Sequence, residues 1–214
     1  MQKKILLIGA GGIGSLLAIF VAKAVDQSGL GKNVLLTIMD GDIVEKRNLP
    51  HQFFSVDDIG KSKVGRVVAQ IRSTGLLNQG GFSVVSLEKN LVEGFVFDEY
   101  DLVVVAVDHG KPRNLVHKNT VYWLDLRARG DGFVMWSSVD DYRILSALPK
   151  LEDGLSASCQ LEGAVETGNI QFGFALAAAH GAQWIIQWLR GSNVPVGRIY
   201  SAHMGELPYP EVES

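Results

Sequence analysis

Residues Lys4 to Asp42 read KILLI-GAGGIG-SLLAIFVAKAV-DQSGLGKN-VLLTIM-DGD, and this stretch decides the fold. A short apolar run, Ile5 to Ile8, leads into a glycine cluster from Gly9 to Gly14. An alanine-rich helical pattern follows, and then a second apolar run that ends in Asp40. Strand, glycine turn, helix, strand and acid, in this order, form the layout of a nucleotide-binding βαβ unit.

Each part of this unit has a physical task. Glycine tolerates positive φ and close backbone approach, as a tight strand-to-helix turn requires. The helix that follows presents unpaired N–H groups and the positive end of its dipole to phosphate oxygens. The acid Asp40 can accept hydrogen bonds from ribose hydroxyls. A glycine pattern alone also fits a structural turn without a ligand, and it is the acid at the end of the second strand that favours a nucleotide.

Composition limits the class of protein. A chain of 214 residues fits one domain, and 47% apolar residues allow a substantial buried sheet. Charged residues make up 20% and the net charge is -3, which argues against nucleic acid as a partner. The single cysteine, Cys159, excludes an intramolecular disulfide framework and a cysteine-rich zinc site. No stretch reaches the roughly 20 apolar residues of a membrane span. We therefore expect a soluble, cytoplasmic protein without a membrane partner.

Later segments extend the βαβ unit into a larger sheet. Residues 192–214 are expected to form a C-terminal tail with one strand, behind a domain at residues 1–191, and residues 140–166 look irregular. The patterns predict strands at Phe82–Leu87, Leu102–Val107, Val121–Leu126, Phe133–Val139 and Arg198–Ala202, and helices at Val64–Gly75, His109–Thr120 and Asn169–Arg190. The fold class is α/β, a Rossmann-like, doubly wound, mostly parallel sheet with a short antiparallel extension.

Four further segments, taken in order, resemble the ThiF/MoeB/HesA-type adenylyltransferases of the ubiquitin-activating-enzyme-like superfamily. The resemblance is good over about residues 3 to 130 and loose over residues 155 to 191. No single segment is specific, but the ordered set is. The segments are Asp40-Gly41-Asp42, Asn48-Leu49-Pro50-His51-Gln52, Gly60-Lys61-Ser62-Lys63, and a buried strand ending in Asp108 that is followed by Arg113.

The resemblance implies an enzyme that uses ATP and Mg²⁺ to activate a C-terminal carboxylate as an acyl-adenylate, with release of pyrophosphate. The implied partner is a small ubiquitin-like or sulfur-carrier protein, or a peptide, that ends in glycine, and the implied assembly is a homodimer or heterodimer. The implied site places Gly9, Gly11 and Gly14 at the phosphates, Asp40 at the ribose, Asp42 near the nucleotide or its metal, Asn48, Gln52 and Lys63 beside the phosphates, and Asp108 on Mg²⁺.

The chemistry of these residue types agrees with that reaction. Bringing two anions together requires cations, and Lys63 with a metal ion on Asp108 would supply them. Mg²⁺ is commonly held by one or two carboxylates together with phosphate oxygens. No general base is needed, because the attacking carboxylate is already ionised.

The chain departs from the family at several positions. The arginine of the N-L-x-R-Q segment is His51, and Arg47 would compensate if this stretch is helical, because positions i and i+4 share a face. The zinc-binding cysteine pairs are missing. The chain starts at its first strand, so we expect no N-terminal helix of the type whose arginine reaches into the partner's site. Arg127 and Arg129 are candidate substitutes for that arginine.

Cys159 begins the segment Cys159-Gln160-Leu161-Glu162-Gly163-Ala164-Val165. This resembles the family segment C-x-x-x-G-V, whose cysteine takes over the acyl group. Cys159 is therefore a candidate nucleophile if its thiolate is favoured. The alternatives are a small buried residue and the remnant of a lost zinc site.

Two other functions stay open from the sequence. The first is a non-catalytic scaffold subunit of a heterodimer, which His51 and the expected lack of the arginine helix favour. The second is a nicotinamide-dependent oxidoreductase, which the first βαβ unit alone would allow. Residues 48–52 and 60–63 have no role in that chemistry.

Overall fold

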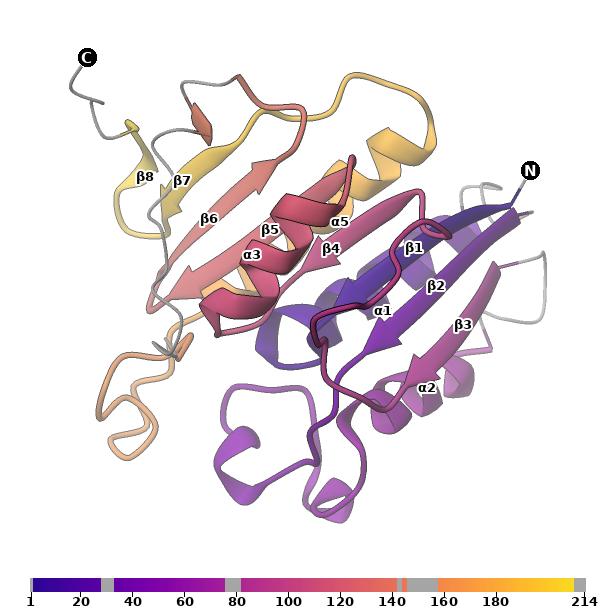
Figure 1. Cartoon of the computed structure of the whole chain (residues 1–214). Coiled ribbons are helices and arrows are strands. Elements are labelled where there is room, and N and C mark those ends of the chain that lie inside the picture. The colour runs from indigo at the N-terminus through magenta and orange to yellow at the C-terminus, as the bar shows by residue number, and fades with distance from the viewer. Residues whose placement is uncertain (1, 28–32, 76–81, 142–143, 146–157, 210–214) are drawn as a thin grey trace.

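The computed structural model describes residues 2–27, 33–75, 82–141, 144–145 and 158–209. Its centre is one sheet, in which the first five strands along the chain pair in parallel and the last three are added antiparallel (Figure 1). The strands are β1 (Lys3–Ile8), β2 (Val34–Met39), β3 (Phe82–Leu87), β4 (Leu102–Val105), β5 (Trp123–Arg129), β6 (Gly132–Ser137), β7 (Arg198–Ser201) and β8 (Gly205–Leu207). Their order across the sheet is β3-β2-β1-β4-β5-β6-β7-β8. The predicted fold class is confirmed.

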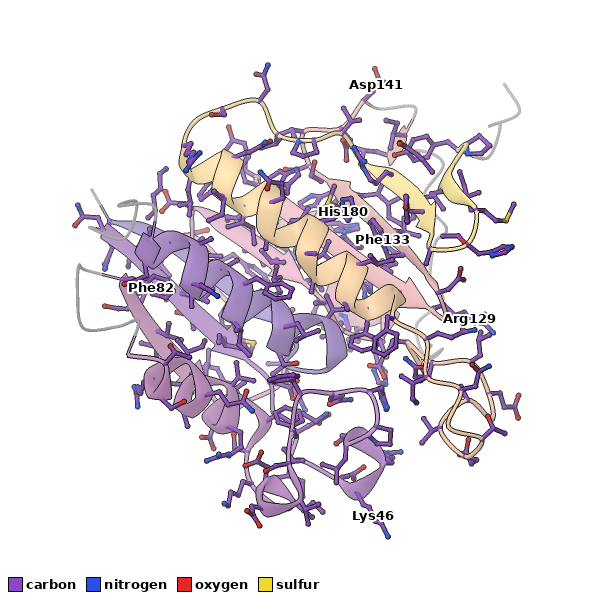
Figure 2. All side chains as sticks on the ribbon, turned by 180° about the vertical axis from the view of Figure 1, so that it is seen from behind. Lys46, Phe82, Arg129, Phe133, Asp141 and His180 are labelled. Carbon is purple, nitrogen blue, oxygen red and sulfur yellow. The ribbon has the colours of Figure 1, made fainter. Side chains whose placement is uncertain are left out.

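Helices cover both faces of the sheet. Helices α1 (Gly12–Gln27), α2 (Lys63–Ser73) and α5 (Gly173–Leu189) lie on one face, and α3 (Gly110–Asn119) lies on the other. Figure 2 shows α1 and α5 side by side across the first of these faces. Ile5 and Leu7 of β1 enter the core under α1, whereas Leu6 and Ile8 enter the core on the side of α3. A strand buried on both faces needs apolar residues at every position, which explains the uninterrupted run. None of the helices in the described residues is long and apolar enough to span a membrane.

The strand order creates a crevice between β1 and β4. The chain moves from β1 to β2 on one side and later returns to β4 on the other. The connections that leave these two neighbours therefore run in opposite directions. In open α/β sheets, ligands bind outside the carboxyl ends of the strands at such a point.

The antiparallel end of the sheet differs from expectation in two ways. We expected the strand to stop at Leu126, before Arg127 and Arg129, but β5 continues to Arg129. Its pairing with β6 extends to Arg129 opposite Gly132, because a tight turn at Gly130, with φ +61°, reverses the chain there. Both arginines are therefore strand residues. In addition, the sequence did not indicate β8, which pairs with β7 at the edge of the sheet.

Parts of two predicted segments lie outside the described residues. These parts are residues 142–143 and 146–157 of the irregular stretch and residues 210–214 of the tail. The strand expected at Arg198 is present as β7, which ends at Ser201. The division between a domain at residues 1–191 and a tail stays a prediction, although β7 and β8 belong to the same sheet as the other strands.

Candidate active site

A pocket of about 1230 Å³ lies at the crevice. This is larger than the roughly 300 to 1,000 Å³ of a usual small-molecule site. The structure brings nearly all the sequence-predicted site residues together here, the exception being Gly14. The lining of the pocket includes Gly9, Gly11, Asp40, Asp42, Arg47, Asn48, Gln52, Lys63, Asp108 and Cys159, together with His51, Arg127 and Arg129.

The three glycines of the turn have different roles. Gly9 has φ +102°, and a Cβ there would lie 2.6 Å from the carbonyl oxygen of Ala106. A Cβ on Gly14 would lie 1.8 Å from the carbonyl oxygen of Gly9. Both residues are therefore required for packing. A Cβ on Gly11 would meet no atom closer than Nε2 of Gln52, at 3.9 Å. The space above Gly11 belongs to the pocket, where a phosphate could approach the backbone.

Asp40 joins the end of β2 to the glycine turn. Its Oδ2 accepts a hydrogen bond from the N–H of Ala10 at 2.7 Å, and its Oδ1 accepts one from the N–H of Asp42 at 2.8 Å. Burial raises the pKa of the carboxyl group, while these two hydrogen bonds and nearby Lys63 act in the opposite direction. A carboxylate has about four lone-pair sites, so Asp40 can still accept from ribose hydroxyls.

Lys63 is a buried cation at the start of α2. Its Nζ lies 2.9 Å from Oδ2 of Asp42, and its side chain is 10% exposed whereas that of Asp42 is 60% exposed. The backbone supports the pair, because the N–H of Lys63 donates to the carbonyl of Asp42 at 3.0 Å. The ammonium group is thus held at the pocket wall, where phosphate oxygens could compete with Asp42.

The loop with the predicted phosphate contacts has mixed outcomes. Asn48 is mainly structural: its Oδ1 accepts from the N–H of Glu45 at 2.8 Å and caps a single 3-10 turn, Lys46–Asn48. Because this turn ends at Asn48, the proposed i, i+4 alignment of Arg47 with His51 is wrong. Arg47 is 80% exposed and pairs with Glu45.

His51 and Gln52 present polar atoms that the described part of the chain leaves without a hydrogen-bond partner. These atoms are Nδ1 of His51 and Oε1 of Gln52, and both are buried. Burial lowers the pKa of His51, and Lys63 lowers it further, so the ring is neutral at pH 7. His51 therefore does not replace the charge of an arginine. Buried polar atoms without partners are costly, which favours a bound ligand or water beside them.

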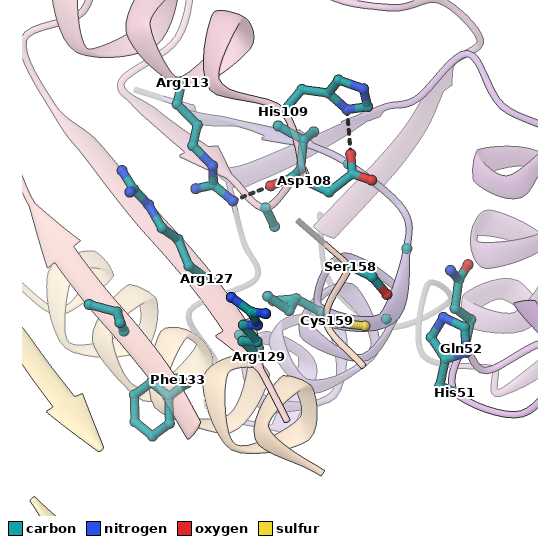
Figure 3. Close-up of a pocket in the computed structure, with 18 of the residues that line it drawn as sticks. His51, Gln52, Asp108, His109, Arg113, Arg127, Arg129, Phe133, Ser158 and Cys159 are labelled. Atoms are coloured by element: carbon teal, nitrogen blue, oxygen red, sulfur yellow. Dashed lines mark hydrogen bonds and ion pairs between the residues drawn. The ribbon is translucent and has the colours of Figure 1, made fainter. Parts of the chain in front are cut away.

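Asp108 follows β4 and lines the pocket. Its side chain is 51% exposed, and Oδ1 lies 2.5 Å from Nδ1 of His109 (Figure 3). Among the described residues, no group of three or more His, Cys, Asp or Glu side chains is placed to hold a metal ion. A metal at Asp108 would therefore need phosphate oxygens as further ligands, as is usual for Mg²⁺.

A buried charge cluster lies behind Asp108. Asp125 of β5 is fully buried and accepts from Arg113 of α3, and its Oδ2 accepts from Nη2 of Arg127 at 2.8 Å. Arg113 also donates to the carbonyl oxygens of Val107 and Leu126. It therefore connects the segment after β4 to the middle of β5 directly beside Asp108, which explains why an arginine is buried there.

Both arginines of the cluster are cations at pH 7, because a guanidinium group is not deprotonated in proteins. Burial lowers the pKa of Arg127 to about 10 and that of Arg113 well below its usual value. His117, whose Nε2 lies 3.1 Å from Oδ2 of Asp125, has its pKa lowered to about 4 by burial and by the two arginines. The carboxylate of Asp125 therefore lies beside two cations, Arg113 and Arg127, and the neutral imidazole of His117.

Cys159 reaches the pocket on a loop that is fastened to the β5–β6 turn. Its carbonyl accepts from the N–H of Gly130 at 2.9 Å. Gln160 fixes the loop through two hydrogen bonds with the backbone of Gln171, at 2.7 and 3.0 Å. Figure 3 shows Cys159 near Arg129. Burial raises the pKa of the thiol, and Asp108 raises it further. The protein without substrate therefore favours the thiol over the thiolate.

This raised pKa predicts slow alkylation of Cys159. Iodoacetamide reacts with the thiolate, so at pH 7 we expect a rate several-fold below that of free cysteine, increasing with pH through the alkaline range. Mass spectrometry of the alkylated peptide measures the rate. A rate at pH 7 above that of free cysteine would show that the thiolate of Cys159 is favoured. It would contradict the raised pKa of this thiol.

Sequence reasoning missed several residues of the site. It assigned no role to Asp125 or His117, and it omitted Lys89, Asn90 and Leu91, which line the pocket from the segment after β3. A signal for Asp125 was present: a charged residue inside the apolar run Trp123–Leu126 is almost never buried without a partner.

A comparison with protein-family models gives a clear result. The model described as the ThiF family matches residues 1–205. The chain belongs to the ThiF family.

Curated ThiF-like relatives include the "Probable adenylyltransferase/sulfurtransferase MoeZ" of Mycobacterium tuberculosis, 30% identical over 176 residues, which are 76% of this chain and 42% of that protein. Another is the "Probable molybdopterin-synthase adenylyltransferase" of Porphyra purpurea, 32% identical over 119 residues, which are 54% of this chain and 28% of that protein. The chain thus spans less than half the length of either relative.

Solved structures agree with the ThiF-type fold. The crystal structure of Escherichia coli MccB with ATP has a TM-score of 0.66 at 20% identity, covering 97% of this chain and 63% of MccB. MccB in complex with N-formylated MccA has a TM-score of 0.66 at 21% identity and covers 97% of this chain and 64% of MccB. At this level of identity the likeness establishes the fold.

Proposed function

We propose that this chain is an ATP-dependent adenylyltransferase that activates the C-terminal carboxylate of a ubiquitin-like or sulfur-carrier protein, or of a peptide. One observation carries the proposal: a single pocket at the β1/β4 crevice contains the open glycine Gly11, the acid Asp40, the buried cation Lys63 and the carboxylate Asp108. The printed names of the relatives agree, since they include adenylyltransferases.

The pocket suits ATP in its shape and polar groups. The space above Gly11 is open, Asp40 retains acceptor capacity for the ribose, and the unpartnered atoms of His51 and Gln52 lie in the same wall. Mg²⁺ bound with ATP would neutralise phosphate charge, and Asp108 would be the carboxylate that holds it. In the proposed complex, the nucleotide or its metal ion would therefore contact Gly11, Asp40, His51, Gln52 and Asp108.

The chain's own groups would position the reactants. A carboxylate oxygen of the acyl substrate forms a bond to the α-phosphorus while the bond from this phosphorus to the bridging oxygen breaks, and pyrophosphate leaves with that electron pair. Lys63 would stabilise the negative charge on the phosphates, and the arginines of β5 would lower the repulsion between the two anions. No proton is transferred, so a neutral His51 does not impede the step.

Several finer assignments belong to this proposal. The partner is a small carrier or peptide with a C-terminal glycine, the assembly is a homodimer or heterodimer, and the compartment is the cytoplasm. Transfer of the acyl group to Cys159 is a further step that would require its pKa to fall when substrate binds, because burial raises it in the protein without substrate.

Thermal unfolding with different nucleotides tests the nucleotide class. At about 100 times its Kd, a ligand stabilises the folded state by about 2.7 kcal/mol. For a chain of this size, this corresponds to an increase in Tm of about 5 to 10 °C. We expect this increase with Mg·ATP and none with NAD. An increase with NAD alone would support an oxidoreductase, and no increase with either would support the scaffold subunit.

A further inference from the structure

Arg127 lies in a row of side chains that crosses four strands. Arg127 pairs with Val134 of β6, Val134 with Ile199 of β7, and Ile199 with Leu207 of β8. All four are half-buried and line the pocket. The row therefore begins with a cation on β5 and continues as an apolar floor on β6 to β8.

The guanidinium group of Arg127 is fixed before any ligand binds. Its Nη2 donates to Oδ2 of Asp125 at 2.8 Å, and its Nε lies 3.3 Å from both carboxylate oxygens. The guanidinium carbon lies 5.0 Å from the ring centroid of Trp136. The side chain is only 16% exposed. A planar cation held at one edge by a carboxylate and over one face by an indole is a preorganised anion receptor.

Both arginines of the cluster line the pocket, and the side chain of Arg127 is the more exposed of the two, at 16% against 4% for Arg113. The guanidinium group of Arg113 contacts Asp125 and two backbone carbonyls. His117 is neutral at pH 7, because its pKa is about 4. Asp108 is the acid on the pocket side of the cluster, and in the proposed complex it holds the metal ion. Arg127, which lines the pocket while it is paired with Asp125, would then add a positive charge on this side of Asp108 that attracts a second anion.

The order of the strands indicates which anion Arg127 would bind. Across the sheet the glycine turn belongs to β1, Asp108 follows β4, and Arg127 lies on β5. Since Val105 pairs with Asp125, Arg127 is level with Val107, the residue before Asp108. Neighbouring strands are about 4.8 Å apart. Arg127 is therefore on the side of Asp108 that faces away from the glycine turn. If the phosphates lie on the glycine turn, this is the side on which the attacking group would approach.

We propose that Arg127, positioned by Asp125, binds the terminal carboxylate of the acyl substrate, while the apolar row of Val134, Ile199 and Leu207 accommodates the chain end behind it. This rests on the proposed function. Arg127 binds and orients the carboxylate while one of its oxygens bonds to the α-phosphorus, and the arginine neither gains nor loses a proton. Asp125 acts through Arg127 and is a positioning residue.

Peptide binding tests this assignment apart from nucleotide binding. The probe is a dye-labelled hexapeptide ending in Leu-Gly-Gly, made as the free acid and as the C-terminal amide. It is titrated into protein saturated with Mg²⁺ and AMPCPP, whose α,β-methylene group prevents release of pyrophosphate. We expect the wild-type protein to bind the acid about tenfold more tightly than the amide, as for one charge-assisted contact.

Arg127→Gln should reduce this preference to less than about twofold and leave the affinity for AMPCPP unchanged. Arg72→Gln, on the exposed end of α2, is the matched control and should behave like the wild type. A preference retained in Arg127→Gln, or absent from the wild type, would overturn the assignment. An equal loss of AMPCPP affinity in Arg127→Gln would assign the arginine to the phosphates instead. If the wild type fails to bind AMPCPP, the proposed function itself fails.

Asp125→Asn tests the positioning role. It should weaken the preference for the acid, and in the Arg127→Gln background it should have no further effect on it. Additive losses would contradict a role through Arg127. If Asp125→Asn does not fold, Arg127→Lys decides, because a lysine keeps the charge but not the planar fork that Asp125 holds. An intermediate preference supports positioning, and a full wild-type preference overturns it.

Discussion

Replacing Asp108 by alanine is expected to reduce ATP–pyrophosphate exchange by about 10²- to 10³-fold, in line with the loss of a preorganised charge-stabilising group. Asp108 is the carboxylate at the end of β4 that would share Mg²⁺ with the phosphates. Without it the charge that develops around the α-phosphorus is not neutralised. The measurement is incorporation of labelled pyrophosphate into ATP in the presence of a carrier that supports exchange by the wild type.

The matched control for this substitution is Asp98→Ala. Asp98 is exposed and does not line the pocket. Its exchange rate should be that of the wild type. Exchange at more than a tenth of the wild-type rate in the Asp108→Ala variant, with a normal melting temperature, would remove Asp108 from the proposed mechanism.

Substituting Gly14 by alanine is expected to destabilise the protein by about 3 kcal/mol or more. The added Cβ would lie 1.8 Å from the carbonyl oxygen of Gly9, and a backbone atom in a tight turn cannot move aside easily. The turn and the start of α1 must both shift. Chemical denaturation monitored by circular dichroism measures the free energy of unfolding.

Gly11→Ala provides the contrast. Here the Cβ would meet no atom closer than 3.9 Å, so the free energy of unfolding should change by less than about 1 kcal/mol. The methyl group would instead occupy space for the phosphates, and the affinity for ATP should fall about tenfold or more. Equal stability of the Gly14→Ala protein and the wild type would mean that the turn is not packed as described.

The sequence predicted the βαβ unit and the site at its crevice because their signals are local. An uninterrupted apolar run, a glycine turn and an acid at a strand end each follow from neighbours in the chain. The ends of parallel strands meet at one edge of a sheet, so the strand pattern is enough to group Asp40 and Asp108. Lys63, at the start of α2, was placed in the site by the family resemblance.

The remainder of the site depends on contacts between distant residues. Arg127 and Arg129 lie in β5 because of its register with β6, which no local pattern reveals. Asn48 caps a turn instead of remaining free for phosphate, and this follows from backbone geometry. Asp125 is buried because Arg113 and Arg127 converge on it from α3 and β5. Such pairings appear only when the whole sheet is assembled.

The electrostatics of the site also differ from the expectation based on the loop. His51 is neutral at pH 7 because its pKa is lowered, and Arg47 is exposed beside Glu45. The fixed arginine charge is instead on β5, one strand beyond Asp108. Cations on the acyl side and Lys63 on the phosphate side would flank the reacting centre. This arrangement needs no arginine at position 51.

ATP–pyrophosphate exchange by the unchanged protein is the most direct test of the central claim, which is that this pocket adenylates a C-terminal carboxylate. Small glycine-ended proteins encoded beside the gene are the first carriers to use. We predict exchange that requires both Mg²⁺ and a carrier with a free C-terminal carboxylate, and that stops when this carboxylate is amidated. Tight binding of Mg·ATP without exchange for any of these carriers would contradict the claim.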